Sequence, residues 1–258
     1  MDEPSRRLRR AAKQLIDTDR ELGGDWLARG EPLPAGPAGE EVPPAPPAPA
    51  RDGGEARRKA AELRAIDLDE VRQCTRCKLA GGRTNTVFGE GNPDADIVFV
   101  GEGPGAEEDK QGRPFVGRAG ELLAKMIAAM GLDRQDVFIC NVIKCRAPGN
   151  RAPATDEVEA CWEYLLRQLR IIRPKVIVSL GNPATHALLN TTVGITRLRG
   201  QWQSLPMLDP DLAGTKVMPT FHPAFLLRSY NKDTRGKVWS DLQEVMRELG
   251  MPGASRQP

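Results

Sequence analysis

Four of the five cysteines are spaced in a way that suits metal binding. Cys74 and Cys77 form a C-x-x-C pair, and Cys145 and Cys161 follow much later in the chain. Two thiolates close in sequence, completed by two distant ones, can hold either a zinc ion or a [4Fe–4S] cluster. The spacing does not choose between these metals, and redox chemistry or chance spacing is a further alternative. Cys140, the fifth, lies inside an apolar run, which indicates packing in the core.

A glycine-rich turn with several carboxylates is the second candidate region. The apolar run Ile97–Val100 is typical of a buried parallel strand, and it stops at Gly101. Glu102, Glu107, Glu108 and Asp109 lie in or just after the turn that follows. Open α/β sheets bind their ligands at the carboxyl ends of the strands, where this turn would lie. Taken by itself, the turn is equally well read as a plain connector between a strand and a helix.

Polar side chains also lie at or just after the ends of two further predicted strands. Asn141 lies near the end of the second strand, and His222 immediately follows the fourth. Side chains at the carboxyl ends of neighbouring parallel strands can meet in one crevice. A lone histidine is more often structural than catalytic, and His186, within a short apolar helix, is interpreted as structural.

Strands that alternate with helices predict an α/β fold with a largely parallel sheet covered on both faces. Thr155 is expected to cap one of the helices. The stretch 195–205 is compatible with a strand or a loop. The predicted strands are 97–100, 137–143, 175–180 and 216–220, and the predicted helices are 117–130, 155–172, a short one ending at 189, and 235–249.

Composition limits the class of protein. The chain has 258 residues, 40% of them hydrophobic and 28% charged, which fits one sizeable domain with appendages. A net charge of +2 is too small to indicate nucleic-acid binding by itself. No apolar run approaches the roughly 20 residues that a membrane span needs, and the first residues lack the apolar stretch of a secretory signal. Five cysteines in such a chain indicate metal or redox chemistry more than disulfides.

The two ends of the chain are predicted to be appendages. Residues 1 to about 28 have the spacing of a basic amphipathic helix, and Glu31–Ala50 holds eight prolines in twenty residues. Such a proline-rich segment cannot form a packed core. We therefore expect a basic helix and a disordered, Pro/Ala-rich tether over 1–55, a catalytic domain over 56–250, and a flexible tail over 251–258.

Several motifs occur in the order found in the family 4 uracil-DNA glycosylases, which this sequence resembles from about residue 71 to 249. The resemblance implies the three-layer α/β/α sandwich of the uracil-DNA glycosylase superfamily. It also implies a [4Fe–4S] cluster, rather than zinc, at the four cysteines Cys74, Cys77, Cys145 and Cys161. The implied activity is hydrolysis of the N-glycosidic bond of uracil in DNA, which leaves an abasic site in base excision repair. The motifs are Gly101–Asp109 (GEGPGAEED), Gly112–Gly117 (GRPFVG), Asn141–Arg151 (NVIKCRAPGNR) and Phe221–Arg228 (FHPAFLLR).

The same resemblance implies roles in binding uracil. Phe115 would stack on the uracil ring, and Asn141 would read its Watson–Crick edge through N3–H and O4. Neutral His222 would donate to O2, where negative charge develops as the bond breaks. Backbone N–H groups of the turn at Gly103 would also face O2. Glu108 would lie beside C5 and disfavour the methyl group of thymine.

Other implied roles concern the attacking water and the DNA strand. Glu102 and Asn150 would hold the water or order the loop. Several branches of the superfamily have Asp or Asn where this chain has Gly103, so no strong general base is evident. The stretch 148–153 lacks the extra histidine of the covalently linking relatives, and turnover is therefore expected.

The DNA contacts would come from the last motif and from scattered cations. Leu226, Leu227 and Arg228 would enter the space that the flipped base leaves, although the two leucines could almost equally be helix core. Cations near a phosphate backbone position a protein on DNA. The cations predicted to do so are Arg146, Arg151, Arg197, Arg199 and Lys232.

The expected partner is uracil-containing DNA, single- or double-stranded. We expect the protein to act as a monomer at the nucleoid, in the cytoplasm of a prokaryote, and not at a membrane. The N-terminal tail is expected to bind a repair or replication partner. Two other classes compete with an enzyme: a nucleic-acid-binding module that has lost catalysis, and an iron–sulfur electron-transfer protein.

Overall fold

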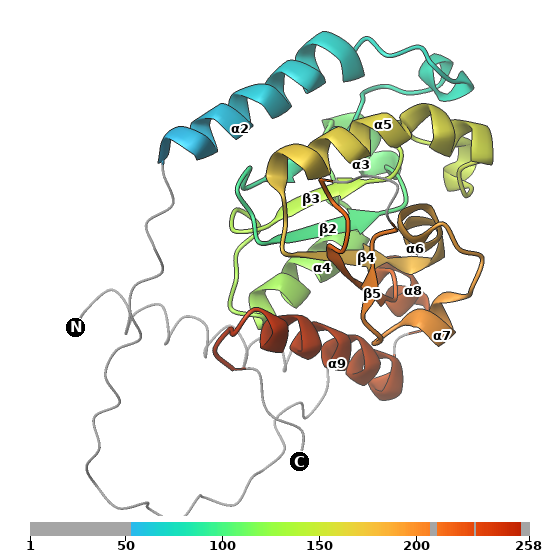
Figure 1. The fold of residues 1–258 in the computed structure, drawn as a ribbon. Helices are drawn as coiled ribbons and strands as arrows, with labels where there is room; N and C mark the ends of the chain where they lie inside the picture. The colour runs from blue at the N-terminus through green and yellow to red at the C-terminus, as the bar shows by residue number, and fades with distance from the viewer. Residues whose placement is uncertain (1–52, 207–210, 230, 254–258) are drawn as a thin grey trace, which may run out of the picture.

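The structure, a computed structural model, describes residues 53–206, 211–229 and 231–253. Its centre is a six-stranded sheet in the order β1-β3-β2-β4-β6-β5 (Figure 1). The four central strands run parallel, whereas β1 and β5 pair antiparallel at the two edges. The strands are β1 Glu90–Gly91, β2 Ile97–Gly101, β3 Phe138–Asn141, β4 Val176–Leu180, β5 Gln203–Ser204 and β6 Lys216–Thr220.

The four predicted strands and the mostly parallel sheet are confirmed, and helices cover the sheet (Figure 1). Three of the helical elements are not α-helices: η1 is a π-helix, and η2 and η3 are 3-10 helices. The helical elements are α2 Gly53–Ala65, η1 Ile66–Val71, η2 Lys78–Gly81, α3 Ala106–Gln111, α4 Arg118–Ala129, η3 Pro148–Asn150, α5 Thr155–Ile172, α6 Gly181–Leu189, α7 Ile195–Leu198, α8 Pro223–Arg228 and α9 Lys232–Glu248.

Each face of the sheet has its own hydrophobic core. Successive residues of a strand point to opposite faces, and Val98 of β2 belongs to the core that contains Leu169 of α5. Phe99, next along the strand, belongs to the other core, with Leu123 of α4 and Val245 of α9. Two cores on opposite sides of one sheet make a three-layer α/β/α arrangement.

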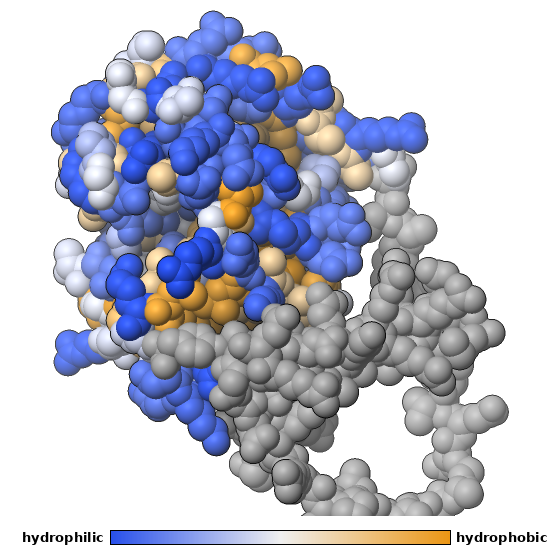
Figure 2. Space-filling model, turned by 180° about the vertical axis from the view of Figure 1, so that it is seen from behind, coloured by the Kyte–Doolittle hydropathy of each residue, from blue (hydrophilic) through white to orange (hydrophobic). Residues whose placement is uncertain are grey.

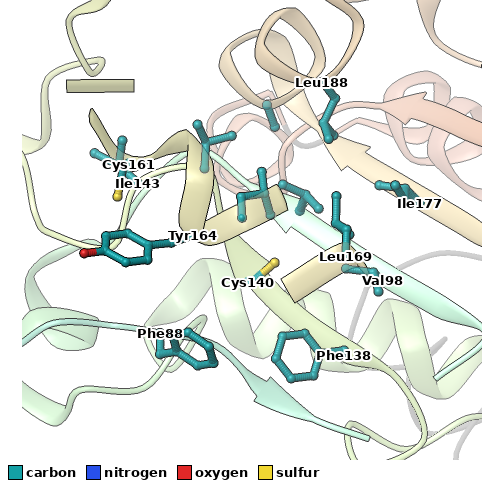
Figure 3. Packing of buried hydrophobic residues seen from close by; sticks show 14 of the residues in the cluster. Phe88, Val98, Phe138, Cys140, Ile143, Cys161, Tyr164, Leu169, Ile177 and Leu188 are labelled. Atoms are coloured by element: carbon teal, nitrogen blue, oxygen red, sulfur yellow. The ribbon is translucent and has the colours of Figure 1, made fainter. Parts of the chain in front are cut away.

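The core under α5 also contains Cys140, which is 1% exposed. Figure 3 shows this cysteine among apolar side chains that include Phe138, Leu169 and Val98. The prediction that Cys140 packs in the core is confirmed.

The predicted helix 155–172 is confirmed, but the prediction that Thr155 is its cap is wrong. Ala154 occupies the N-cap, and the backbone N–H of Ala154 donates to Glu157 Oε2 at 2.8 Å. Thr155 is already the first helical residue, so its hydroxyl is not the cap. Arg151 donates to both carboxylate oxygens of Glu157 and holds the pKa of that buried carboxyl at about 2.

The predicted domain boundaries stay a prediction, and the structure describes the chain only from Gly53 onward at its N-terminal side. Helix α2 begins at Gly53, inside the stretch assigned to the tether. The rest of the predicted N-terminal extension and residues 254–258 lie outside the described residues. The stretch 195–205 contains helix α7 and the edge strand β5 instead of a single strand or loop. Among the helices of the described residues, none is long and apolar enough to cross a membrane.

Candidate active site and cysteine-lined cavity

Two predicted site residues, Phe115 and Asn141, meet at Gly101, where β2 and β3 end. A Cβ atom placed on Gly101 would lie 2.4 Å from Asn141 Oδ1 and 2.5 Å from Phe115 Cζ. Gly101 pairs with Asn141 in the sheet, and Phe115 reaches the same point from the loop after α3. Only glycine leaves room at position 101 for both the ring and the amide.

Asn141 is the least satisfied polar side chain of this group. It is 1% exposed, and neither its amide oxygen nor its amide nitrogen has a hydrogen-bond partner in the described structure. A buried polar group without a partner is costly, and native proteins rarely keep one without a reason. The amide therefore offers one acceptor and one donor to a ligand that enters beside Phe115.

Phe115 is held in a conformation that a bulky residue rarely adopts. Its φ angle is 50°, in the left-handed region. Glu108 Oε1 accepts hydrogen bonds from the backbone N–H groups of Val116 and Gly117, each at 2.9 Å. Arg134 donates to the carbonyl oxygen of Phe115 at 3.0 Å from the other side. These contacts clamp the loop, so the ring is placed before any ligand arrives.

The sequence did not predict that Glu108 and Arg134 hold the backbone of the Phe115 loop. Glu108 was predicted to lie beside C5 of uracil, whereas its recorded contacts tie down the Phe115 loop. Arg134 was not predicted, and it also donates to the carbonyl oxygen of Pro114 at 2.8 Å and to Glu90. Nothing in the spacing of Arg134 marks it, because its role depends on a contact between distant parts of the chain.

His222 lies at the end of β6 and faces the same site. Its ring centroid lies 5.7 Å from that of Phe115, with 30° between the ring planes. A Cβ atom on Gly181, at the end of β4, would lie 3.0 Å from His222 Cβ, so two neighbouring strand ends touch here. His222 is the N-cap of α8, and its Nδ1 accepts the backbone N–H of Ala224 at 3.1 Å. The neutral ring therefore carries its hydrogen on Nε2.

The surroundings keep His222 neutral. Burial, and then the positive charge of Arg228, lower the pKa of His222 from about 6.5 to about 4, with Glu108 acting weakly in the opposite direction. Burial raises the pKa of Glu102, and Arg228 partly offsets this effect. The positive charge of Arg228 therefore acts on both the His222 ring and the Glu102 carboxyl group. Gly103 lies in the same turn, where a Cβ atom would come within 2.6 Å of Ile143 Cγ1.

We expect His222 to make the protein less stable in acid. Its pKa is lower in the folded protein than in an unfolded chain, so the unfolded state takes up the proton first and stability is lost as the pH falls below 6.5. The loss should reach about 3 kcal/mol near pH 4. Denaturant unfolding of the wild type and His222→Gln across this range measures the effect, since glutamine does not titrate. If both proteins lose stability equally, His222 does not have the lowered pKa.

The remaining predicted site residues lie further out. Asn150 is exposed in η3 with a φ angle of 54°, and its Oδ1 accepts from Arg146 Nε at 2.8 Å, so its recorded hydrogen bond is not to the pocket. Leu227 is half-buried and packs against the core, while Arg228 is exposed. Phe225, not singled out from the sequence, is 36% exposed on the same helix.

One predicted phosphate contact is wrong. Arg199 forms a bidentate ion pair with Asp241 of α9, and its side chain is only 17% exposed. Its guanidinium also lies 5.6 Å from the ring centroid of Phe221, so it supports the end of β6 from inside. Arg151 is engaged by Glu157, whereas Arg197 and Lys232 are exposed. Figure 2 shows that the face seen from behind is largely hydrophilic, with hydrophobic side chains gathered in a few places.

The four predicted metal ligands line one cavity. Cys74 and Cys77 precede η2, Cys145 follows β3, and Cys161 lies on α5. Burial raises the pKa of the Cys161 thiol to about 11, and that of Cys145 is raised for the same reason. Within the described residues, no three His, Cys, Asp or Glu side chains come close enough to share a single metal ion.

Two N–H donors point at sulfur atoms of this cavity. Arg83 Nη1 donates to Cys145 Sγ at 3.3 Å, and the backbone N–H of Lys144 donates to Cys161 Sγ at 3.2 Å. Arg83 also donates to the carbonyl oxygen of Cys74 at 2.7 Å. Such donors stabilise negative charge on sulfur and are among the factors that tune iron–sulfur centres. The cysteines therefore form one site, separate from the Phe115, Asn141 and His222 pocket.

The α/β sheet carries Phe115, Asn141 and His222 together at the carboxyl ends of its strands, and four cysteines line a separate cavity. Residues 88–243 match the family model of the Uracil DNA glycosylase superfamily. Within that class, the chain belongs to the type-4 uracil-DNA glycosylases, as the sequence motifs predicted.

Three relatives of this family show the extent of the match. The type-4 uracil-DNA glycosylase of Thermotoga maritima is 49% identical over 188 residues, which cover 71% of this chain and 93% of the relative. That of Sulfurisphaera tokodaii is 46% identical and that of Saccharolobus solfataricus 44%, covering 71% of this chain and 83% and 86% of the relatives.

Proposed function

We propose that this protein excises uracil from DNA by hydrolysing the bond between uracil N1 and deoxyribose C1′, leaving an abasic site for base excision repair. The observation that carries the proposal is the buried, unpaired amide of Asn141 beside the Phe115 ring, with neutral His222 5.7 Å from that ring. A planar base with one donor and one acceptor on its edge satisfies that amide.

The target base must leave the duplex to reach this pocket. Enzymes that act on a base flip it out, read its edge by hydrogen bonds and stack on its face. Phe115 supplies the stacking surface. The Asn141 amide accepts N3–H of uracil and donates to O4.

Charge stabilisation is the main catalytic effect available. As the bond breaks, uracil leaves as an anion and negative charge grows on O2. A neutral His222 that carries its hydrogen on Nε2 donates to O2, assisted by the backbone N–H groups at Gly103. Glu102 has a raised pKa, which suits a role in holding the attacking water. Asn150 orders the turn after β3 through Arg146.

A release assay tests this proposal. The purified protein should free uracil from a uracil-containing oligonucleotide and leave an otherwise identical thymine-containing strand intact. Binding without release would favour a nucleic-acid-binding module that has lost catalysis. Neither binding nor release, with a redox-active cluster, would favour an electron-transfer protein.

The DNA contact is assigned to α8. Leu226 is 3% exposed and Leu227 is half-buried, so the exposed apolar side chain of the motif is Phe225. The ring of Phe225 packs on that of Phe221 at 4.9 Å between centroids. An aromatic side chain can stack on any unpaired base, and Arg228 beside it suits a phosphate. We therefore place Phe225 ahead of Leu227 as the residue that enters the stack.

The cysteine cavity is assigned a [4Fe–4S] cluster. Each of the four thiolates would bind a different iron of such a cluster, so the four cysteines need not converge on one ion. The geometry of Cys74, Cys77, Cys145 and Cys161 around a shared cavity, with N–H donors aimed at two sulfurs, fits this arrangement. The cluster would tie the segment before β1 to α5 and to the segment after β3. We assign it a structural role.

Replacing Cys145 with serine should release the iron and lower the thermal stability, because the thiolates close a long loop. Cys140→Ser is the matched control, since Cys140 is buried in the core and away from the cavity. Elemental analysis and acid-labile sulfide should give about four of each per wild-type chain. Zinc in place of iron, or loss of iron only from the Cys140 variant, would overturn the assignment.

The remaining proposals concern the substrate, the oligomeric state, the cellular location and the N-terminal stretch. The substrate is uracil-containing DNA, and we propose that a monomer acts on it at the nucleoid in the cytoplasm. The N-terminal stretch up to residue 55 would recruit a repair or replication partner without contributing to the site.

A further inference from the structure

Lys144 is a buried lysine that neither the cluster nor the chemistry above accounts for. It is 1% exposed, and it lies between the base-reading Asn141 and the cysteine Cys145. Its ammonium donates to the backbone carbonyl oxygen of Asn141 at 2.7 Å and to Gln168 Oε1 at 2.6 Å. Neither partner is a carboxylate. A buried ammonium is costly, and a methionine would fill the same space, so a specific function is indicated.

The backbone of Lys144 joins the cysteine cavity to the segment before β1. Its N–H donates to Cys161 Sγ, and its carbonyl oxygen accepts the N–H of Val87 at 2.8 Å. One residue therefore contacts both the cysteine site, through its backbone, and the end of β3, through its side chain.

Gln168 fixes the other end of this arrangement. It lies on α5 and is 0% exposed, and its Nε2 donates to the carbonyl oxygen of Phe88 at 2.9 Å. The amide is thereby oriented with its oxygen toward Lys144. The ammonium also lies 6.0 Å from the centroid of the Phe88 ring. Lys144 cannot move without breaking contacts to three separate segments.

Asn141 needs such support because its side chain has none. Both amide atoms are without a partner, so the position of the amide is set by the backbone and by packing. The sheet holds that backbone on one side, where the N–H of Val142 donates to the carbonyl oxygen of Gly101 at 2.9 Å. The Lys144 ammonium holds the Asn141 carbonyl.

We propose that Lys144 is a positioning residue: its ammonium fixes the backbone of Asn141 and so places the amide that reads the base, coupling the cysteine site to base selection. The inference rests on the proposed excision of uracil.

The test is Lys144→Met in the full chain. A displacement of about 1 Å can cost about 10²-fold in rate, and we expect single-turnover uracil excision to fall by about that factor while iron per chain stays at the wild-type value. The preference for binding DNA with a non-hydrolysable uracil nucleotide over the thymine equivalent should fall as well. A purely structural role would not move that preference.

A double-mutant cycle shows whether Lys144 acts through Asn141. In an Asn141→Ala background the amide is already gone, so adding Lys144→Met should change excision by less than about threefold. An undiminished effect in that background would overturn the proposal. So would wild-type excision and binding preference in the iron-loaded Lys144→Met protein.

Two further variants address stability. Lys59→Met is the matched control, because Lys59 is also buried but pairs with Asp94 and the carbonyl oxygen of Ile172, away from the pocket. It should lower stability and leave base preference unchanged. If Lys144→Met does not fold, the double variant Lys144→Met/Gln168→Met is used instead, because it also removes Gln168 Oε1, the acceptor that loses its donor in the single variant. The same losses of excision rate and base preference are expected for the double variant.

Absence of uracil release by the wild type would refute the proposed function. An active wild type matched by both Lys144 variants would refute only this inference.

Discussion

Asn141→Asp is expected to lower uracil excision by about 10⁴-fold at alkaline pH and to shift the ratio of uracil to cytosine removal toward cytosine. An ionised carboxylate has only acceptors, so it can take N3–H of uracil but repels O4. It can also accept from the N4 amino group of cytosine. Because position 141 is buried, the neutral carboxyl group is favoured, and it offers an acceptor and a donor as the amide does. Part of the loss should therefore be recovered on acidification.

Single-turnover excision of uracil and cytosine across a pH series measures both effects. Asn141→Leu is the matched control, since it fills the same space without polar atoms and should lose uracil excision at every pH. In the wild type the amide has no partner that fixes its orientation in the described structure, so its selection against cytosine also depends on the rest of the pocket. A variant that removes uracil at the normal rate and still ignores cytosine would show that residue 141 does not read the base.

The parallel strands could be predicted because their signal is local. Ile97–Val100 is a continuous apolar run because β2 is buried on both faces, and every residue of Ile97–Gly101 is buried. The strands β1 and β5 have two residues each, which is too short to show an alternation of apolar and polar residues. Helix α3 was missed because its six residues are mostly charged.

Residues expected to contact the base could be proposed from the motifs, whereas residues that support another residue could not. Phe115, Asn141 and His222 follow from motif resemblance, and the structure brings these three together at the strand ends. The roles of Arg134 and Lys144 depend on backbone carbonyl groups brought close by the fold, which no spacing in the chain reveals.

Charge in the sequence was the least reliable guide. Arg199 was expected to meet DNA, but a carboxylate of α9 holds it inside the protein. The role expected for Glu108, lying beside C5 where the thymine methyl would need the same space, stays a prediction, and the structure adds two hydrogen bonds from backbone N–H groups of the Phe115 loop to this carboxylate. A charged side chain in the sequence needs an ion-pair or hydrogen-bond partner, and only the fold shows which group that partner is.

His222→Ala is expected to lower single-turnover uracil excision by about 10²–10³-fold, which corresponds to about 2.7–4 kcal/mol of transition-state stabilisation. The donor on Nε2 meets full charge on O2 only as the bond breaks. Binding of DNA with a non-hydrolysable uracil nucleotide should therefore change much less than the rate. The two measurements together separate loss of catalysis from loss of the pocket.

His186→Ala is the matched control for this prediction. His186 Nε2 pairs with the carbonyl oxygen of Val193 at 3.0 Å on α6, so its loss should leave excision unchanged. The neutral state of His222 adds a second criterion. With a pKa near 4, its titration should produce no change in the wild-type rate between about pH 5.5 and 8. A rate for His222→Ala within threefold of the wild type would remove the residue from the mechanism.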